Sequence, residues 1–217
     1  MWIPCDYKQL GTIDKSITDP VKALINSNDW SSNEYNRYEL PLKRGKVTVF
    51  HYLVYHANQV SYSDFQLRLL EAFNPVVDEI MKLFQGYIKV RGEIATLLPN
   101  TSLELHFDNQ WFHQHCRRIH VPITTNNQCQ QIFEDRIYHL EENKIYEINN
   151  RNLHSAANFG TTDRTHLILD LLDETIYNSI DRNKKKLIEK SVPETYRKNE
   201  RKVYKPIHGL GKTNSRA

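Results

Sequence analysis

Long hydrophobic runs are missing from this chain of 217 residues. No uninterrupted apolar stretch approaches the roughly 18–20 residues that a membrane-spanning helix needs, so the sequence predicts no contact with a membrane. The first residues, Met1 to Asp6, do not pair a basic segment with an apolar one, so no secretory signal is visible. We therefore expect an intracellular protein.

Cysteine is scarce as well. Cys5, Cys116 and Cys129 are an odd number and too few for a disulfide framework. We therefore expect a reducing, cytoplasmic compartment, with Cys116 and Cys129 as buried free thiols. The abundant Asn, Lys, Ile and Tyr indicate an AT-rich microbial or viral genome.

Flexible linkers, proline-rich tracts and internal repeats are absent, so no internal domain boundary is visible. Charge nevertheless divides the chain. Residues 184–217 hold 11 basic and 3 acidic residues, a net charge of +8, which leaves 18 basic and 23 acidic residues, net −5, for residues 1–183. We expect a single domain over 1–183 and a basic C-terminal extension over 184–217. The extension suits an acidic partner, but no nucleic-acid-binding motif accompanies it, so nucleic acid is not expected.

The first 88 residues predict helices with some strand. Asp19-Pro20 resembles an N-cap followed by proline at the first helical position, which predicts a helix through Asn26. The β-branched and aromatic segment 46–56 predicts a strand. Ser63-Asp64 opens a second helix, Asn74-Pro75 is expected to restart it, and Gly86 to end it.

After Gly86 the apolar period changes from 3.6 to 2, which indicates strands. Turn residues separate the segments that we expect to form them: 87–98, 102–108, 117–123, 130–140, 144–149 and 165–172. Short strands at this spacing predict a β-sandwich or jelly-roll barrel. The preceding helices are expected on one outer face of it, and a last helix over 174–190.

The most informative pattern is His106-Phe107-Asp108. Residues i and i+2 of a strand share a face, so the imidazole and the carboxylate are two legs of a metal site. His154, on a later strand, is the best third leg. Two His and one carboxylate leave half of an octahedral metal open, which suits non-haem Fe(II) oxygenases. Alone, His-x-Asp is more often a surface or structural pair.

Cationic groups surround this pattern. Arg164 follows His154 by ten residues and begins an apolar strand, where a buried guanidinium needs an anion. Arg118 and His120 alternate onto one strand face, and His166 shares the face of Arg164 as either a supporting or a packed residue. The planar fork of arginine suits carboxylates, so these groups could hold a dicarboxylate.

These residues lie in four segments: LELHFD, RRIHVPITTN, YEINNRNLHSAANFG and DRTHLILD. In order and spacing, over residues 89–173, they resemble the aspartyl/asparaginyl β-hydroxylase-like family of 2-oxoglutarate-dependent oxygenases. His-Ser-Ala-Ala-Asn-Phe also resembles the branch that hydroxylates free proline. The resemblance implies a mainly β fold with flanking helices around a double-stranded β-helix (jelly-roll, cupin-like) core. It implies Fe(II), 2-oxoglutarate and O2 as cofactor and cosubstrates.

The resemblance also implies roles for individual residues. Fe(II) would be bound by His106, Asp108 and His154. The distal carboxylate of 2-oxoglutarate would be bound by Arg164, and the cosubstrate end of the pocket lined by Arg118 and His120. Residues near the site or in contact with substrate would be Trp111, His113, Asn126 and Asn158.

Three positions depart from the family pattern. Asn100 and Asn143 stand where glycine is usual, and asparagine tolerates the left-handed backbone that such turns require. Ala95, with Thr96 beside it, stands where some members have a hydroxyl residue that contacts the cosubstrate.

Alternatives remain at this stage. His113, His115, Cys116 and Cys129 could form a tetrahedral zinc site, although their spacing is unusual for one. The function is expected to be hydroxylation of an amino-acid side chain, within a protein or peptide of Asp/Asn type. Hydroxylation of a free amino acid such as proline is the second interpretation, and a non-catalytic metal-binding jelly-roll module the third.

Overall fold

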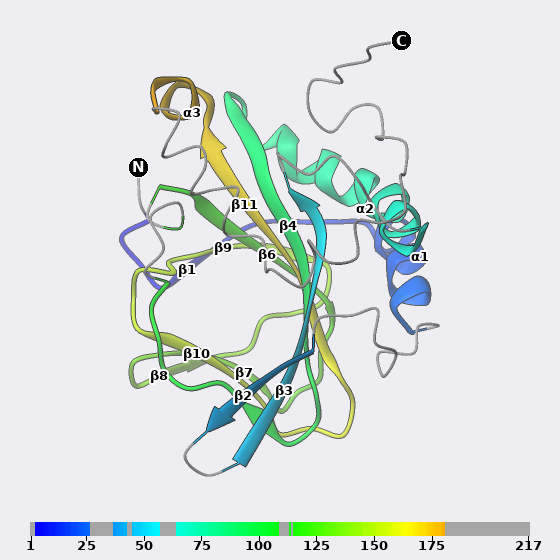
Figure 1. Ribbon diagram of the computed structural model, residues 1–217, viewed down its shortest axis with the longest axis vertical. Helices are drawn as coiled ribbons and strands as arrows, with labels where there is room; N and C mark the ends of the chain where they lie inside the picture. Colours follow the sequence, from blue (N-terminus) through cyan, green and yellow to red (C-terminus); the bar gives the residue numbers. More distant parts are fainter. Residues whose placement is uncertain are drawn as a thin grey trace.

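The computed structural model describes residues 3–26, 37–42, 45–56, 64–108, 113 and 115–180, with side chains described for 3–26, 67–108, 113 and 115–180. Two antiparallel sheets lie opposite each other and enclose the interior of a barrel (Figure 1). This is the jelly-roll arrangement that the sequence predicts.

The larger sheet has the strand order β1-β9-β6-β11-β4-β3-β2 within the described chain, with every neighbouring pair antiparallel. Its strands are β1 (Tyr7–Thr12), β2 (Arg37–Leu42), β3 (Gly45–His56), β4 (Tyr87–Leu97), β6 (Arg117–Thr124), β9 (Lys144–Ile148) and β11 (Arg164–Asp173). The smaller sheet has the order β5-β10-β7-β8. Its strands are β5 (Thr101–Ser102), β7 (Cys129–Phe133), β8 (Arg136–Tyr138) and β10 (His154–Asn158).

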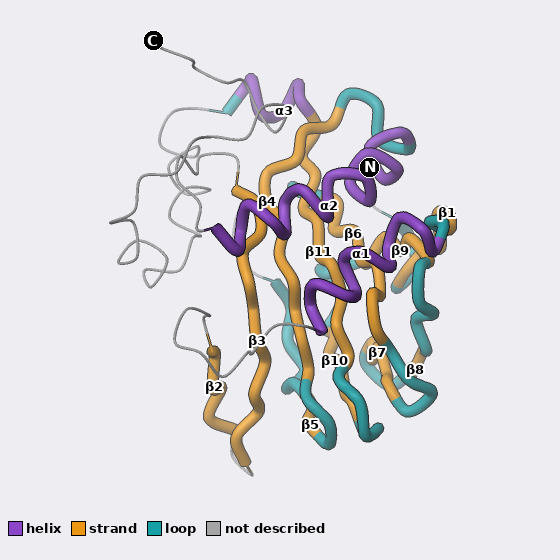
Figure 2. The backbone as a smooth tube through the Cα atoms, turned by 90° about the vertical axis from the view of Figure 1, so that its right-hand side faces the viewer, coloured by secondary structure: helices purple, strands orange, loops and turns teal. Residues whose placement is uncertain are grey.

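Two helices, α1 (Lys15–Asn26) and α2 (Asp64–Lys82), cover the outer face of the larger sheet (Figure 2). Each presents one apolar face, and the main core lies between them and the sheet. The buried side chains of this core include Val21, Ile25, Leu69, Phe73, Ile80, Ile119, Val121, Leu167 and Leu169. Because alternate strand residues point outward into this core, the intervening residues of β6 and β11 point into the barrel. These inward positions include Arg118, His120, Arg164, His166 and Asp170.

The helix starts differ from the prediction. Helix α1 begins at Lys15 rather than Pro20, because the carboxylate of Asp14 accepts a hydrogen bond from the Ser16 amide, 2.8 Å away, and caps the helix. Helix α2 runs through Pro75 without restarting. The prolines lie on exposed helix faces, where water can satisfy the carbonyl that loses its partner. The last helix, α3, is Glu174–Ser179 and ends there, because Ile180 is extended with φ −72° and ψ 140°, so the prediction of one helix over 174–190 is wrong.

Four predicted strands are confirmed as β4, β6, β9 and β11, and segment 46–56 as β3. Two predictions are wrong in detail. Segment 102–108 leaves β5 after Ser102 and rejoins β10 through an isolated bridge at His106. Segment 130–140 is a hairpin of β7 and β8, because Glu134 turns the chain with a φ of 53°.

The structure also tests the predictions made for single turn residues and for the cysteines. Asn100 and Asn143 have φ angles of 56° and 64°, the left-handed backbone expected where glycine is usual. Cys116 and Cys129 are buried free thiols, as predicted. Within the described ranges, no helix is long and apolar enough to cross a membrane. The extension 184–217 lies outside the described residues.

Candidate metal centre

Two histidines face each other at the mouth of the barrel. His106 and His154 exchange backbone hydrogen bonds, with N···O distances of 2.9 and 2.8 Å, and this bridge ties segment 103–108 to β10. Their ring centroids are 4.6 Å apart. The bridge fixes both side chains from two distant parts of the sequence.

Each of these rings is oriented by its own backbone. His106 Nδ1 lies 2.8 Å from the Glu104 carbonyl oxygen, and His154 Nδ1 lies 2.8 Å from that of Asn152. A carbonyl oxygen only accepts, so Nδ1 must carry the proton in both rings. Nε2 of each ring therefore keeps its lone pair, which is the form that binds a metal.

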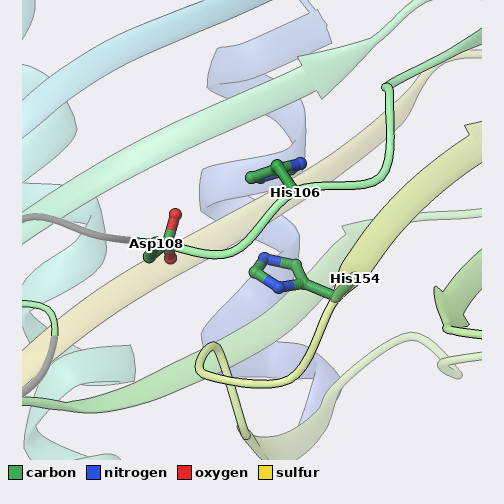
Figure 3. A group of neighbouring side chains, drawn as sticks. All are labelled: His106, Asp108 and His154. Atoms are coloured by element: carbon green, nitrogen blue, oxygen red, sulfur yellow. The ribbon is translucent and has the colours of Figure 1, made fainter.

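Asp108 completes the group. One ligand atom each from His106, Asp108 and His154 lies within 4.8 Å of the other two, and within the described ranges no other His, Cys, Asp and Glu side chains form such a group. Figure 3 shows Asp108 and His106 on one segment and His154 at the start of β10. Asp108 Oδ2 accepts hydrogen bonds from Arg118 and from Asn150, which leaves Oδ1 as the available metal ligand. Two neutral imidazoles and one carboxylate fit Fe(II).

Arg118 connects the metal centre to a buried charge network. Its guanidinium donates to Asp108 and, at 2.9 and 3.1 Å, to both oxygens of Asp170. Arg91 Nε donates to Asp170 Oδ2 at 2.9 Å, and Arg91 Nη2 lies 3.3 Å from Glu93 Oε1. Burial alone would raise the pKa of Asp170, but Arg118 and Arg91 outweigh burial and hold that pKa well below its ordinary value. The network stays ionised and fixes Arg118 beside the metal ligand.

Arg164 lies buried on the same inner face of β11. Its Nη2 donates to Gln131 Oε1 of β7 at 3.1 Å, and no described carboxylate forms an ion pair with it. Burial lowers the pKa of Arg164 to about 10, so the guanidinium remains charged at neutral pH. A buried cation whose partner is a neutral amide is a site for an anion.

Two further histidines line the wall between these groups. His120 and His166 are buried, and His120 Nδ1 lies 3.4 Å from His166 Nδ1. Nε2 of each ring has no hydrogen-bond partner within the described chain. Unsatisfied buried nitrogens next to Arg164 are suited to a polar ligand inside the barrel. The sequence left the role of His166 open, and the structure directs it inward.

The four residues predicted to lie near the substrate have different surroundings in the structure. Asn126 Nδ2 donates to Asn158 Oδ1 at 3.2 Å, while Asn158 Nδ2 donates to the Leu97 and Thr162 carbonyls. Through these bonds Asn126 and Asn158 connect the loops at residues 126 and 162 to strands β4 and β10. His113 is buried, with Nε2 3.2 Å from Arg91 Nη2. Trp111 lies outside the described residues.

The alternative zinc site of His113, His115, Cys116 and Cys129 is not assembled among these described residues. Cys116 packs with Val90 and Leu172, and burial raises the pKa of its thiol. Cys129 Sγ lies 3.4 Å from Asn158 Oδ1. The metal group found in the described chain contains neither cysteine.

Other residues of the site were missed from the sequence. They are Arg91, Glu93, Gln131, Asn150 and Asp170. Strand alternation could have found Asp170, because positions 164, 166, 168 and 170 share one face of β11. Arg91 and Glu93 follow the same rule on β4, which pairs with β11 through Arg91 and Asp170. Asn150 lies in a turn and has no periodic signal.

A double-stranded β-helix with two histidines and one carboxylate at its mouth defines the class of non-haem metal oxygenases. The model of the aspartyl/asparaginyl β-hydroxylase family matches residues 67–174. The chain belongs to this family.

A curated relative supports the same assignment. L-proline cis-4-hydroxylase of Rhizobium meliloti (strain 1021) is 28% identical over 110 residues, which span 50% of this chain. The match spans only 39% of that relative's length.

Solved structures share the fold. A prolyl hydroxylase of Trichoplax adhaerens, in complex with a hypoxia-inducible-factor peptide fragment, has a TM-score of 0.53 and 12% identity, covering 81% of this chain and 88% of its own. The non-haem α-ketoglutarate-dependent epimerase SnoN of nogalamycin biosynthesis has a TM-score of 0.52 and 14% identity, covering 77% and 76%.

Proposed function

We propose that this protein is an Fe(II)- and 2-oxoglutarate-dependent dioxygenase that hydroxylates an amino-acid substrate. The observation that carries the proposal is the meeting of His106, Asp108 and His154 at the mouth of a barrel whose interior also holds the buried, charged Arg164. A bound Fe(II), with 2-oxoglutarate and O2, would supply the oxidising chemistry at a substrate C–H bond. The domain over 1–183 is part of this proposal, and the extension over 184–217 has no assigned role in it.

The residues divide the work. His106 Nε2, His154 Nε2 and one oxygen of Asp108 would hold the metal. Arg164 would bind the distal carboxylate of 2-oxoglutarate in a place that excludes water, where a charge-assisted hydrogen bond is strong. His120 would offer a ring nitrogen to the cosubstrate at the metal end. Arg118 would keep Asp108 in place while anchored by Asp170.

The net charge of the groups around the metal centre affects which substrates can bind there. Beside the metal group lie two guanidinium groups, Arg91 and Arg118, and two carboxylates, Glu93 and Asp170. This set is formally neutral, and a neutral zwitterion enters such a site at a smaller electrostatic cost than a substrate with net charge. Arg91 and Glu93 are its least buried members, with 13% and 11% of their side chains exposed, so they can meet a carboxylate and an ammonium group.

The first candidate substrate is an Asp- or Asn-type residue within a protein or peptide. The second is a free amino acid, and the contacts of Arg91 and Glu93 favour it. The activity named for the relative from Rhizobium meliloti supports the free amino acid. The basic extension over 184–217, which suits an acidic macromolecular partner, lies outside the described residues. Both classes therefore enter the test.

The test begins with anaerobic reconstitution. Purified protein is loaded with Fe(II) and titrated with 2-oxoglutarate, and the visible metal-to-ligand charge-transfer band is recorded. We expect the band in the wild type and its loss in Asp108→Ala. Well-folded wild-type protein without a band would contradict the proposal and favour a non-catalytic barrel.

The second step identifies the substrate class. Succinate formation is measured with free amino acids and with peptide pools that contain Asp and Asn. A free amino-acid substrate predicts turnover that Arg91→Met weakens through KM, whereas a peptide substrate predicts stimulation by the pools alone. The matched control is Arg68→Met, which removes an exposed arginine of α2 on the outer face of the larger sheet.

A further inference from the structure

The inward-facing residues of β11 and β6 stand in a fixed order along the two strands. Asp170 pairs in register with Arg118 of β6, and Ile168 pairs with His120. Since a strand advances about 3.3 Å per residue, inward-facing levels are about 6.6 Å apart. His120 therefore lies one level from the metal end at Arg118, and His166 one level further toward Arg164. His120 and His166 therefore lie between Arg118 and Arg164 in the order of inward-facing positions.

The contact between the two rings is specific. The rings are perpendicular, with an interplanar angle of 88° and centroids 5.6 Å apart, and they meet through Nδ1. Burial, followed by the positive charge of Arg118, lowers the pKa of His120 well below its ordinary value. Burial, followed by the charge of Arg164, does the same to the pKa of His166. Both rings are therefore neutral near pH 7.

Two neutral imidazoles that meet through Nδ1 can share only one proton there. The ring that donates from Nδ1 keeps a bare lone pair at its Nε2. The ring that accepts at Nδ1 must carry its own proton on Nε2. The pair therefore presents one Nε2–H donor and one bare Nε2 to the barrel interior, where neither nitrogen has a described partner.

We propose that His166 is a positioning residue for the cosubstrate, which donates Nδ1–H to His120 and thereby fixes His120 with its Nε2–H toward the carboxylate at the metal end. The opposite arrangement would direct a bare lone pair of His120 at an anion. It would also place the Nε2–H of His166 near Arg164, a group that only donates. This inference rests on the proposed function, because 2-oxoglutarate supplies the carboxylate.

The decisive measurement is the tautomer of each ring. Protein labelled with ¹⁵N on histidine is loaded with diamagnetic Zn(II) and 2-oxoglutarate, and long-range ¹H–¹⁵N correlations are recorded. We expect His120 as the Nε2–H form and His166 as the Nδ1–H form. The reverse assignment in the folded wild type would overturn the proposal.

Affinity provides the second readout. His166→Leu removes the donor, and we expect Kd to rise about tenfold, the loss of one buried hydrogen bond, for both 2-oxoglutarate and pyruvate. The two compounds share the 2-oxo acid end that His120 would contact. His166→Asn, whose amide nitrogen lies close to the position of Nδ1, should restore the wild-type Kd and keep His120 as the Nε2–H form. Unchanged affinity in a folded His166→Leu would contradict the proposal.

Failure of this inference can be told from failure of the proposed function. If metal-loaded wild type binds no 2-oxoglutarate in calorimetry, the proposed function fails. If it binds 2-oxoglutarate while His120 has its proton on Nδ1, only the role of His166 fails. If His166→Leu does not fold, the wild-type spectrum and His166→Asn still decide.

Discussion

Arg118 donates a hydrogen bond to Asp108, and Asp170 holds the same guanidinium from its other side. The candidate metal carboxylate is thus positioned by a cation that is itself fixed by a fully buried anion. Asp170 does not touch the metal group, yet removing its charge leaves Arg118 without its bidentate partner. A change at Asp170 should therefore act on both the fold and the metal.

Asp170→Asn is expected to lower the free energy of unfolding by about 3–5 kcal/mol, because it removes the fully buried anion that the guanidinium groups of Arg118 and Arg91 share. Chemical denaturation of the metal-free protein measures this loss. Asp135→Asn, in the exposed turn between β7 and β8, is the control and should change stability by less than about 0.5 kcal/mol. Equal stability of the two variants would contradict a central role for Asp170.

A second support reaches the metal centre from the N-terminal segment. Asp6 is buried and accepts hydrogen bonds from Arg136 at 2.9 Å, Tyr138 at 3.1 Å and Asn152 at 3.0 Å. The carbonyl of Asn152 in turn orients His154. Asp6 therefore holds the turn that directs a proposed metal ligand.

Asp6→Ala is expected to weaken metal binding about tenfold or more, the usual effect of losing a group that orients a ligand. Calorimetric titration with Mn(II) or Zn(II) measures it. The control is Asp14→Ala, which removes the cap of α1 and lowers stability by about 1 kcal/mol without touching the turn. Metal affinities that match in the two variants would show that Asp6 only stabilises the fold.

The sequence predicted the class of fold and the residue types of the metal centre, because both depend on patterns within single strands. Period-two patterns gave β4, β6, β9 and β11, and the i, i+2 rule placed Arg118 with His120 on one face. The pattern could not give the path of segment 102–108. That segment follows the bridge between His106 and His154, which is a contact across 48 positions of sequence.

Other misses have the same physical origin. Asp19-Pro20 and Asn74-Pro75 are typical helix starts, but here a helix continues through each proline. Both prolines lie on exposed faces, where water can replace the one backbone hydrogen bond that each proline removes. The network around Asp170 depends on register between β11 and its neighbours. Alternation can place Asp170 and Arg91 on the inner faces of their strands, but composition gives no information on register, so their pairing could be found only after the strands were aligned.

Gly160 offers a test of the loop that Asn126 and Asn158 connect. A Cβ at Gly160 would lie 2.2 Å from Asn126 Oδ1, closer than any real contact, so Gly160→Ala must displace Asn126. We expect a loss of about 1–3 kcal/mol in unfolding free energy, typical of overpacking. Gly11→Ala is the matched control, since its Cβ would meet Ile145 at an ordinary 3.6 Å.

A double-mutant cycle identifies the cause. If the clash with Asn126 dominates, Asn126→Ala should recover part of the stability lost in Gly160→Ala, and the two changes should not be additive. Additive losses would place the strain elsewhere in the loop.

Arg164 is expected to select 2-oxoglutarate by binding the distal carboxylate of that cosubstrate. Arg164→Met, which keeps much of the volume, should cost about 2–5 kcal/mol of 2-oxoglutarate binding, or roughly 30-fold or more in Kd. Pyruvate, which lacks that carboxylate, should bind wild type and variant with similar affinity. Calorimetry on the Mn(II)-loaded protein provides both constants. An equal loss for the two compounds would show that Arg164 acts on the metal end instead.

Acid should destabilise the metal-free protein before its carboxylates titrate. Burial, followed by the charge of Arg118, lowers the pKa of His113 to about 4, against an ordinary value of about 6.5. Between these values the unfolded chain binds more protons than the folded one, so stability is complete above pH 6.5 and is lost as the pH falls toward 4. His113 alone accounts for about 3 kcal/mol at most, and the lowered pKa values of His120 and His166 act in the same direction.

Urea denaturation at pH 7.5, 6, 5 and 4.5, with a chelator present, measures this dependence. His113→Gln removes one titrating group, so its unfolding free energy should fall less steeply with acid than that of wild type over the same range. The comparison uses the pH dependence of each protein relative to its own value at pH 7.5, because the substitution also changes packing. Parallel curves for the two proteins would mean that His113 takes up its proton as readily in the folded barrel as in the unfolded chain, and burial beside Arg118 would then not govern its charge.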